Sequence, residues 1–302
     1  MKQSKTNVND IRQMSVFEVF SGIELIYNNF NSPNVNVDKY ITNKYITDNI
    51  MEISHCRKGR VECDLKDGTY LFLGEGDLGI NMLNNHTSKM NFPTNFYEGI
   101  SINLYLDIID KNIPYLLNDT NINIYNIKKK LCSNSSCFVI RATERIEHIF
   151  SELYNIPESI KGDYLKIKVL ELLLFLSVLD PDKQEKKEHF SKFHVETIKA
   201  IHFKITENFS KRYTIDELSK EFCISPTTLK LYFKEVYGTN ISSYLINYRM
   251  KKASEILRTT NNSISQVAYD VGYESQSKFA IKFKEIFGMT PLEYRKKCSG
   301  EK

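Results

Sequence analysis

Long apolar runs are missing from this chain. The longest one in its most hydrophobic stretch covers only residues 172–176, whereas a helix that spans a membrane needs about 20 mostly apolar residues. The residues after Met1 also lack the apolar core of a secretory signal peptide. These two absences argue against membrane-spanning and secreted proteins and predict a cytoplasmic protein that does not bind a membrane.

Cysteine is scarce, and its spacing is uninformative. The six cysteines are spread over 302 residues, none has the C-x2-C spacing of a metal-binding pair, and no histidine cluster lies beside them. We therefore expect free thiols and no metal site. The G-x-S-x-G, H-E-x-x-H and phosphate-loop motifs of common enzyme classes are also absent. The sequence thus predicts no catalytic residues and no cofactor.

The charge is divided unevenly along a chain whose length suits about two domains. Residues 190–302 hold 19 Lys and Arg against 12 Asp and Glu, a net charge of +7. Because the whole chain has a net charge of +4, the preceding residues have a net charge of −3. This asymmetry is expected if only the second part meets a polyanion. A charged stretch that starts at Pro181 separates the parts, and we interpret residues 181–192 as a linker.

The N-terminal part shows short strand patterns. Residues 1–40 are rich in Asn and poorly periodic, and we expect a flexible segment there. The following region, residues 41–180, has brief apolar or alternating runs separated by turn residues, which favour a small antiparallel β barrel or sandwich. These runs cover residues 61–65, 69–73, 78–83, 99–106 and 137–140.

Two helices are predicted after these strands. Ile146, Ile149 and Leu153 recur at helical spacing, and Leu165, Val169, Leu172, Leu173 and Leu176 do so in the next segment. The second helix is apolar on more than one face, so it needs cover. Either its own sheet or a second copy of the chain could supply that cover.

The C-terminal part contains a helix-turn-helix pattern. Thr214 and Glu217 have the spacing of a capping box at the start of a short helix. Residues 222–224 then form a turn, and Ser225 precedes Pro226 as the cap of a second helix, which Gly238 ends. Two short helices joined by a tight turn define this motif.

The same plan recurs 50 residues later. Ser263 caps a helix that Gly272 stops, and Ser275 caps another that Gly288 stops. Phe233 and Phe283, like Lys234 and Lys284, keep the 50-residue offset. An internal duplication outweighs any single motif.

A helix is predicted between the two units, over residues 241–259. Its 19 residues would span about 28 Å at 1.5 Å per residue. Recognition helices in successive major grooves lie about 34 Å apart, so this helix has a suitable length to separate two of them by one turn of DNA. A plain helical bundle remains the alternative interpretation.

The duplicated region resembles the DNA-binding domain of the AraC (arabinose regulator) family of bacterial transcription factors. The resemblance covers about 100 residues, from Phe193 to Lys297. It is carried by Ile264, Val267, Ala268, Val271, Gly272, Tyr273, Ser275, Ser277, Phe279, Phe283, Lys284, Phe287, Gly288, Thr290, Pro291, Tyr294 and Arg295. Of these, we expect Tyr273, Phe279, Phe283 and Phe287 in the core.

The resemblance implies an α+β protein of two parts. Residues 41–180 would form a cupin-like effector and dimerisation domain with two packing helices, and residues 193–302 an all-α domain of seven helices with two helix-turn-helix motifs. The closely spaced histidines of a metal-binding cupin are absent. Implied partners are double-stranded DNA, a small-molecule effector, a second copy of the chain and RNA polymerase.

The resemblance also implies which residues meet DNA. Glutamine can read adenine with two hydrogen bonds, and lysine suits guanine or phosphate. The candidates are Thr227, Thr228, Lys230, Leu231, Lys234, Ser275, Gln276, Ser277, Lys278, Ala280, Ile281 and Lys284.

Two candidates depart from the family pattern. Members often have Arg where this chain has Leu231 and Ile281, which could either touch thymine methyl groups or pack in the core. In the N-terminal half, Arg60 is our candidate for effector binding.

The sequence therefore predicts a transcription regulator whose two recognition helices read adjacent major grooves and whose N-terminal half senses a small molecule. The alternative is a ligand-binding or enzymatic barrel with a basic helical tail for partner binding.

Overall fold

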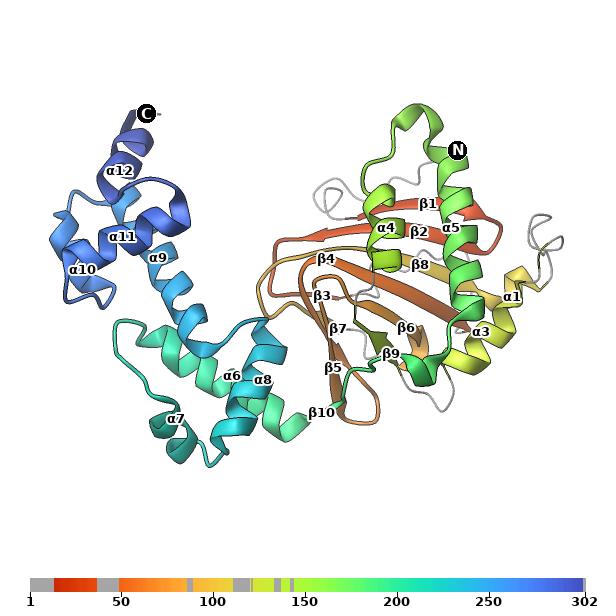
Figure 1. The fold of residues 1–302 in the computed structure, drawn as a ribbon, viewed down its shortest axis with the longest axis horizontal. Helices are drawn as coiled ribbons and strands as arrows, with labels where there is room; N and C mark the ends of the chain where they lie inside the picture. The colour runs from red at the N-terminus through yellow and green to blue at the C-terminus, as the bar shows by residue number, and fades with distance from the viewer. Residues whose placement is uncertain are drawn as a thin grey trace. The chain divides into compact units, whose positions relative to one another are not determined.

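A computed structural model describes residues 14–36, 49–85, 89–110, 120, 122–132, 137–141 and 144–300. The chain forms two compact units, Met1–Lys192 and Phe193–Lys302 (Figure 1). The boundary between them falls at the start of the first helix of the second unit.

The first unit is built on an antiparallel sheet. Its strands are β1 (Met14–Phe20), β2 (Ile23–Phe30), β3 (Asn34–Asn36), β4 (Ile50–Asp64), β5 (Thr69–Gly74), β6 (Leu78–Met82), β7 (Lys89–Asn91), β8 (Tyr97–Tyr105), β9 (Phe138–Ile140) and β10 (Phe190–Ser191). The main path runs β1-β2-β8-β4-β5-β10, with β6 and β7 also paired to β4. The expected antiparallel β architecture is confirmed.

The expectation of a flexible segment over residues 1–40 is wrong for its described part. Residues 14–36 contain three strands, and β2 pairs with β8 over eight residues. Ile23 and Leu25 of β2 are completely buried. The prediction missed these strands because it treated residues 1–40 as one Asn-rich segment, although β1 contains no Asn and is rich in valine and phenylalanine, residue types typical of strands.

The long strand β4 joins the two halves of the sheet. Residues 50–59 pair with β8, whereas residues 60–64 pair with β5, and a bulge lies between Cys56 and Lys58. Side chains alternate along β4, and the bulge shifts this alternation by one residue, so Met51 and Ile53 belong to one core while Cys56 and Val61 belong to another. One core lies under helices and the other on the opposite face of the sheet.

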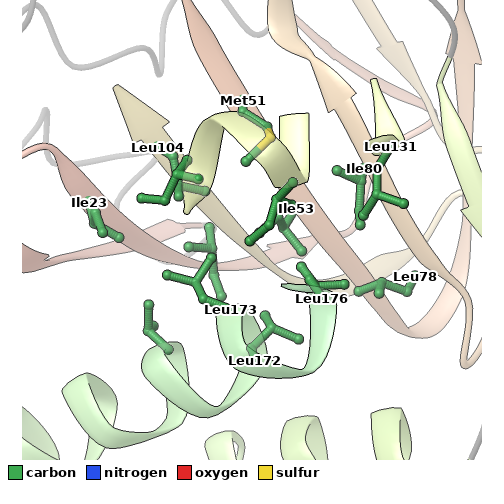
Figure 2. Packing of buried hydrophobic residues seen from close by; sticks show 14 of the residues in the cluster. Ile23, Met51, Ile53, Leu78, Ile80, Leu104, Leu131, Leu172, Leu173 and Leu176 are labelled. Atoms are coloured by element: carbon green, nitrogen blue, oxygen red, sulfur yellow. The ribbon is translucent and has the colours of Figure 1, made fainter. Parts of the chain in front are cut away.

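The helices that cover the sheet are α3 (Ile124–Leu131), α4 (Glu144–Leu153) and α5 (Lys161–Val178), and a one-turn α1 (Leu106–Ile109) follows β8. The two predicted helices correspond to α4 and α5. The number of packing helices was underestimated, because α3 also buries Ile127 and Leu131 in the shared core. Figure 2 shows that core, in which Leu172, Leu173 and Leu176 of α5 face Met51, Ile53, Leu78, Ile80 and Leu104 of the strands.

The predicted linker, residues 181–192, is not a free connection. Phe190 lies in β10, pairs with Tyr70 of β5 and is buried. The ammonium group of Lys187 lies 2.5 Å from the carboxylate of Asp77, and both side chains are nearly inaccessible to solvent. The sequence suggested a linker because the stretch is highly charged, but one of those charges has a buried partner more than 100 residues away.

The second unit is entirely helical apart from its connections. Its helices are α6 (Lys192–Glu207), α7 (Ile215–Glu221), α8 (Pro226–Tyr237), α9 (Ile241–Thr259), α10 (Ile264–Asp270), α11 (Gln276–Phe287) and α12 (Pro291–Gly300). Among the described residues these are seven helices, as expected. Figure 1 shows α8 and α11 at opposite ends of α9.

The cysteines show no sign of cross-linking, since all six are free. No group of three or more His, Cys, Asp or Glu residues could hold a metal ion in the part of the chain that the structure describes. No helix in the same ranges is both long and apolar enough to cross a membrane.

Candidate nucleic-acid interface

The first helix-turn-helix unit forms as its capping residues predict. The Thr214 hydroxyl accepts a hydrogen bond from the Glu217 amide at 3.2 Å, and the Glu217 carboxylate accepts one from the Thr214 amide at 2.9 Å. Cys223 takes a left-handed conformation in the turn, with φ of 51°. The Ser225 hydroxyl then caps α8 by accepting from the Thr228 amide at 3.1 Å.

The second helix-turn-helix motif repeats this arrangement with α10 and α11. Ser263 and Ser275 cap the two helices, as predicted. Gly272 separates them with φ of 81°, and a β-carbon there would collide with the backbone of Ser210, so no other residue fits without a shift. Phe279 and Phe283 are fully buried, and Tyr273 and Phe287 pack against the same cluster, which confirms their predicted place in the core.

Helix α9 connects the two helix-turn-helix motifs without interruption over 19 residues. Near its middle, the Arg249 guanidinium donates to the carbonyl oxygens of Phe209 at 2.6 Å, Lys211 at 2.9 Å, Ser210 at 3.2 Å and Gly272 at 3.5 Å. One side chain therefore connects α9 to the loop before α7 and to the turn between α10 and α11. Nothing in the sequence signals this role, because the four acceptors are backbone atoms brought together by tertiary packing.

Helices α8 and α11 expose equivalent faces. Thr227 matches Ser277, Leu231 matches Ile281, and Lys234 matches Lys284 at the 50-residue offset, and all six are exposed. Leu231 is 46% exposed and Ile281 63% exposed. The structure thus decides against a place in the core for these two residues.

The lysines on these faces differ from others nearby in their ionic contacts. Lys230, Lys234, Lys278 and Lys284 are exposed and form no ion pair with other residues that the structure describes. By contrast, Lys282 pairs with Glu285 on the side of α11. Cations without an acidic partner can contact phosphate without first breaking an ion pair.

The remaining candidates differ in their surroundings. Gln276 is exposed in the first turn of α11, whereas Ala280 is half-buried. The hydroxyls of Thr228 and Ser225 lie 2.8 Å apart, and Ser275 accepts from the Lys278 amide. Thr228 and Ser275 therefore stabilise helix starts, which competes with contacts to DNA.

Arg60, the candidate for effector binding, lies in β4 opposite Gly74 of β5. Its guanidinium occupies the space that a side chain at Gly74 would fill. Arg60 lines neither the cavity beside His55 and Tyr154 nor the one beside Tyr27 and Lys161.

Fold and site together define a class of protein. Two capped helix-turn-helix units lie on one connecting helix, and each presents a short helix whose outer face carries exposed lysines. The second unit is a double helix-turn-helix domain.

Comparison with known proteins agrees with this class. The model of a helix-turn-helix domain family matches residues 218–297. A putative AraC-like transcription regulator of Streptomyces lividans is 33% identical over 87 residues, 29% of each chain. The transposon Tn10 TetD protein of Escherichia coli is 31% identical over 104 residues, 34% of this chain and 75% of TetD. The solved C-terminal domain of the response regulator yesN from Fusobacterium nucleatum is 34% identical and covers 33% of this chain and 95% of that one, with a TM-score of 0.30.

The chain belongs to the AraC family of transcription regulators. The relatives that define the family are regulators and not enzymes, in agreement with the expectation from sequence. The match of the family model lies within the C-terminal unit, and this chain spans only 29% of the Streptomyces lividans relative.

Proposed function

We propose that this chain is a cytoplasmic, sequence-specific DNA-binding transcription regulator, with α8 and α11 reading adjacent major grooves. The observation that carries the proposal is the pair of matching exposed faces at the two ends of an unbroken α9. A helix of 19 residues spans about 28 Å, close to the ~34 Å that separates successive major grooves.

Each face offers three kinds of contact. Thr227, Ser277 and Gln276 can form hydrogen bonds with base edges, and Leu231 and Ile281 can contact thymine methyl groups. Lys234 and Lys284 follow one turn later, where the phosphate backbone would lie. Thr228, Lys230, Ser275, Lys278 and Ala280 complete the proposed contact surface.

The test is binding of the full chain to a duplex selected from random oligonucleotides. We expect the binding constant to fall steeply with salt, because each neutralised phosphate contributes a slope of about −0.9 in a double-logarithmic plot. Gln276→Ala should weaken binding to the selected duplex by about 1–3 kcal/mol and leave binding to unrelated DNA nearly unchanged. Fluorescence anisotropy measures both affinities.

Lys284→Ala is the matched control on the same helix. It should weaken binding to both duplexes and lower the salt slope by about one. If Gln276→Ala weakens binding to unrelated DNA as much as to the selected duplex, Gln276 does not read a base.

We further propose that the first unit senses a small molecule and forms the dimer contact, and that the DNA-bound protein contacts RNA polymerase. The buried side of α5 is covered by its own sheet. The other side exposes Ile167, Leu174 and Val178, at 60%, 53% and 73%. Ile167 and Leu174 are seven residues apart, the spacing at which two helices can pack along a shared stripe.

The double variant Ile167→Glu with Leu174→Glu should convert a dimer into a monomer in sedimentation analysis, because two charges would be buried in the contact. Phe203→Glu changes an equally exposed apolar residue of α6, in the second unit, and should leave the dimer intact. A wild-type chain that sediments as a monomer, or a dimer lost only in Phe203→Glu, contradicts the proposal.

A further inference from the structure

A small cavity lies between β4 and the C-terminal end of α4. Its volume is about 180 Å³, room for roughly six waters at ~30 Å³ each and less than the ~300 Å³ at which sites for drug-sized ligands begin. The lining residues come from β4, from the turn after β5 and from α4 with the residues that follow it. They are His55, Cys56, Arg57, Glu75, Gly76, Glu147, Ser151, Tyr154 and Asn155.

Two polar side chains of this cavity lack hydrogen-bond partners among the residues that the structure describes. His55 is 2% exposed, and neither of its ring nitrogens is paired there. The buried hydroxyl of Tyr154 also has no hydrogen-bond partner among these residues. Buried polar groups are nearly always hydrogen-bonded, because leaving one unpaired costs about 1–3 kcal/mol. Three unpaired polar atoms therefore belong to two of the residues that line the cavity, and a ligand that displaces these side chains slightly could satisfy them.

The His55 ring is neutral at physiological pH. Burial lowers the pKa of His55 to about 4, and its ring stacks on Phe150 with centroids 4.2 Å apart. A neutral imidazole offers one donor and one acceptor. The His55 ring can thus form hydrogen bonds without adding positive charge.

The rim of the cavity is negative. Glu75 and Glu147 are exposed and form no ion pair within the described part of the chain. Arg57 is the cation of the lining, but its guanidinium pairs with Glu98 at 2.8 Å and lies over the Tyr154 ring, 4.4 Å from its centroid. Ser151, Tyr154 and Asn155 bring the C-terminal end of α4 to the site, and helix C-termini favour cations.

We infer that this cavity binds a small amine in its ammonium form, held by the Glu75 and Glu147 carboxylates and by hydrogen bonds from or to His55 and Tyr154. The inference builds on the proposed effector role of the first unit and supplies the chemical class of the effector. The site is distinct from Arg60, which does not line it.

Three four-carbon compounds test the charge requirement on the full-length protein. They are 1,4-diaminobutane, 1,4-butanediol and succinate, which carry two positive charges, none and two negative charges. We expect the diamine alone to raise the melting temperature and to give a measurable dissociation constant by calorimetry. Equal binding of the diol or the succinate, or no binding of the diamine, would overturn the inference.

Three variants locate the binding. Glu147→Gln should weaken diamine binding about tenfold, whereas Glu144→Gln, one turn earlier on α4, should not change it. Tyr154→Phe should weaken binding about fivefold, the effect of one hydrogen bond. It should not lower the melting temperature of the free protein, because the hydroxyl has no partner to lose among the described residues. Unchanged affinity in both Glu147→Gln and Tyr154→Phe would place the diamine elsewhere and refute the site.

DNA binding is measured on the same preparations. A wild-type protein that binds its selected duplex but not the diamine overturns this inference alone and leaves the proposed DNA-binding function intact. A protein that binds the diamine but no duplex fails the proposed function instead.

Discussion

Arg249→Met should loosen the whole second unit, with a loss of about 3 kcal/mol in the free energy that protects its backbone amides. The variant removes a charged donor from four carbonyl oxygens, and hydrogen bonds from charged groups contribute about 1.5–3 kcal/mol. Burial lowers the pKa of Arg249, but the planar, charged fork remains protonated. Hydrogen exchange of the full chain measures the loss, which corresponds to about 100-fold faster exchange in α9 and α10.

Arg258→Met is the matched control. Arg258 belongs to the same helix, is exposed and forms no hydrogen bond or ion pair in the described ranges. The same substitution there should change exchange by less than about 0.5 kcal/mol. If the two variants behave alike, the contacts of Arg249 contribute no net stability. Apolar packing alone then holds α9 to both helix-turn-helix motifs.

Acidification should also destabilise the second unit, through His202. The ring of His202 stacks on Tyr237 at 4.2 Å and lies 2.7 Å from the Tyr244 hydroxyl. Burial lowers its pKa from 6.5 to about 4. Between these two values the unfolded chain binds more protons than the folded one, so stability falls as the pH falls from about 6.5 to 4. The difference in pKa corresponds to a loss on the order of 3 kcal/mol by pH 4.

The pH dependence can be assigned with two variants. His202→Phe keeps an aromatic ring on Tyr237 and should flatten the loss of amide protection in α6 and α9 over that pH range, after correction for intrinsic exchange rates. His148→Phe, a change of a mostly exposed histidine in α4, should leave the loss unchanged. An undiminished pH dependence in His202→Phe would show that other groups cause it.

Predictions from sequence succeeded where the determining contacts are local. The capping box of Thr214 and Glu217, the caps at Ser225 and Ser275 and the glycine stops are formed within three or four residues along the chain. They determine where α7, α8 and α11 begin or end regardless of the rest of the molecule. The 50-residue duplication then showed that the same local plan occurs twice.

The failures share a long-range cause. Residues 1–40 were expected to be flexible, and residues 181–192 were expected to be a linker. Their strands pair with residues far away in sequence, β2 with β8 and β10 with β5, and Lys187 meets Asp77 in a buried ion pair. A strand's stability depends on its partner as well as on its own residues, so the Asn-rich and charged composition of these segments did not prevent strand formation.

The sequence by itself determined that this chain carries two capped helix-turn-helix units separated by a helix of suitable length, because capping and helical periodicity act over a single turn. Only the tertiary structure decided that Leu231 and Ile281 are exposed and that Arg249 links the loop before α7 to the turn after α10. It also decided that His55 and Tyr154 line one cavity. Those relations join residues distant in sequence or depend on which helix face packs inward, and both are set by the packing of the whole domain.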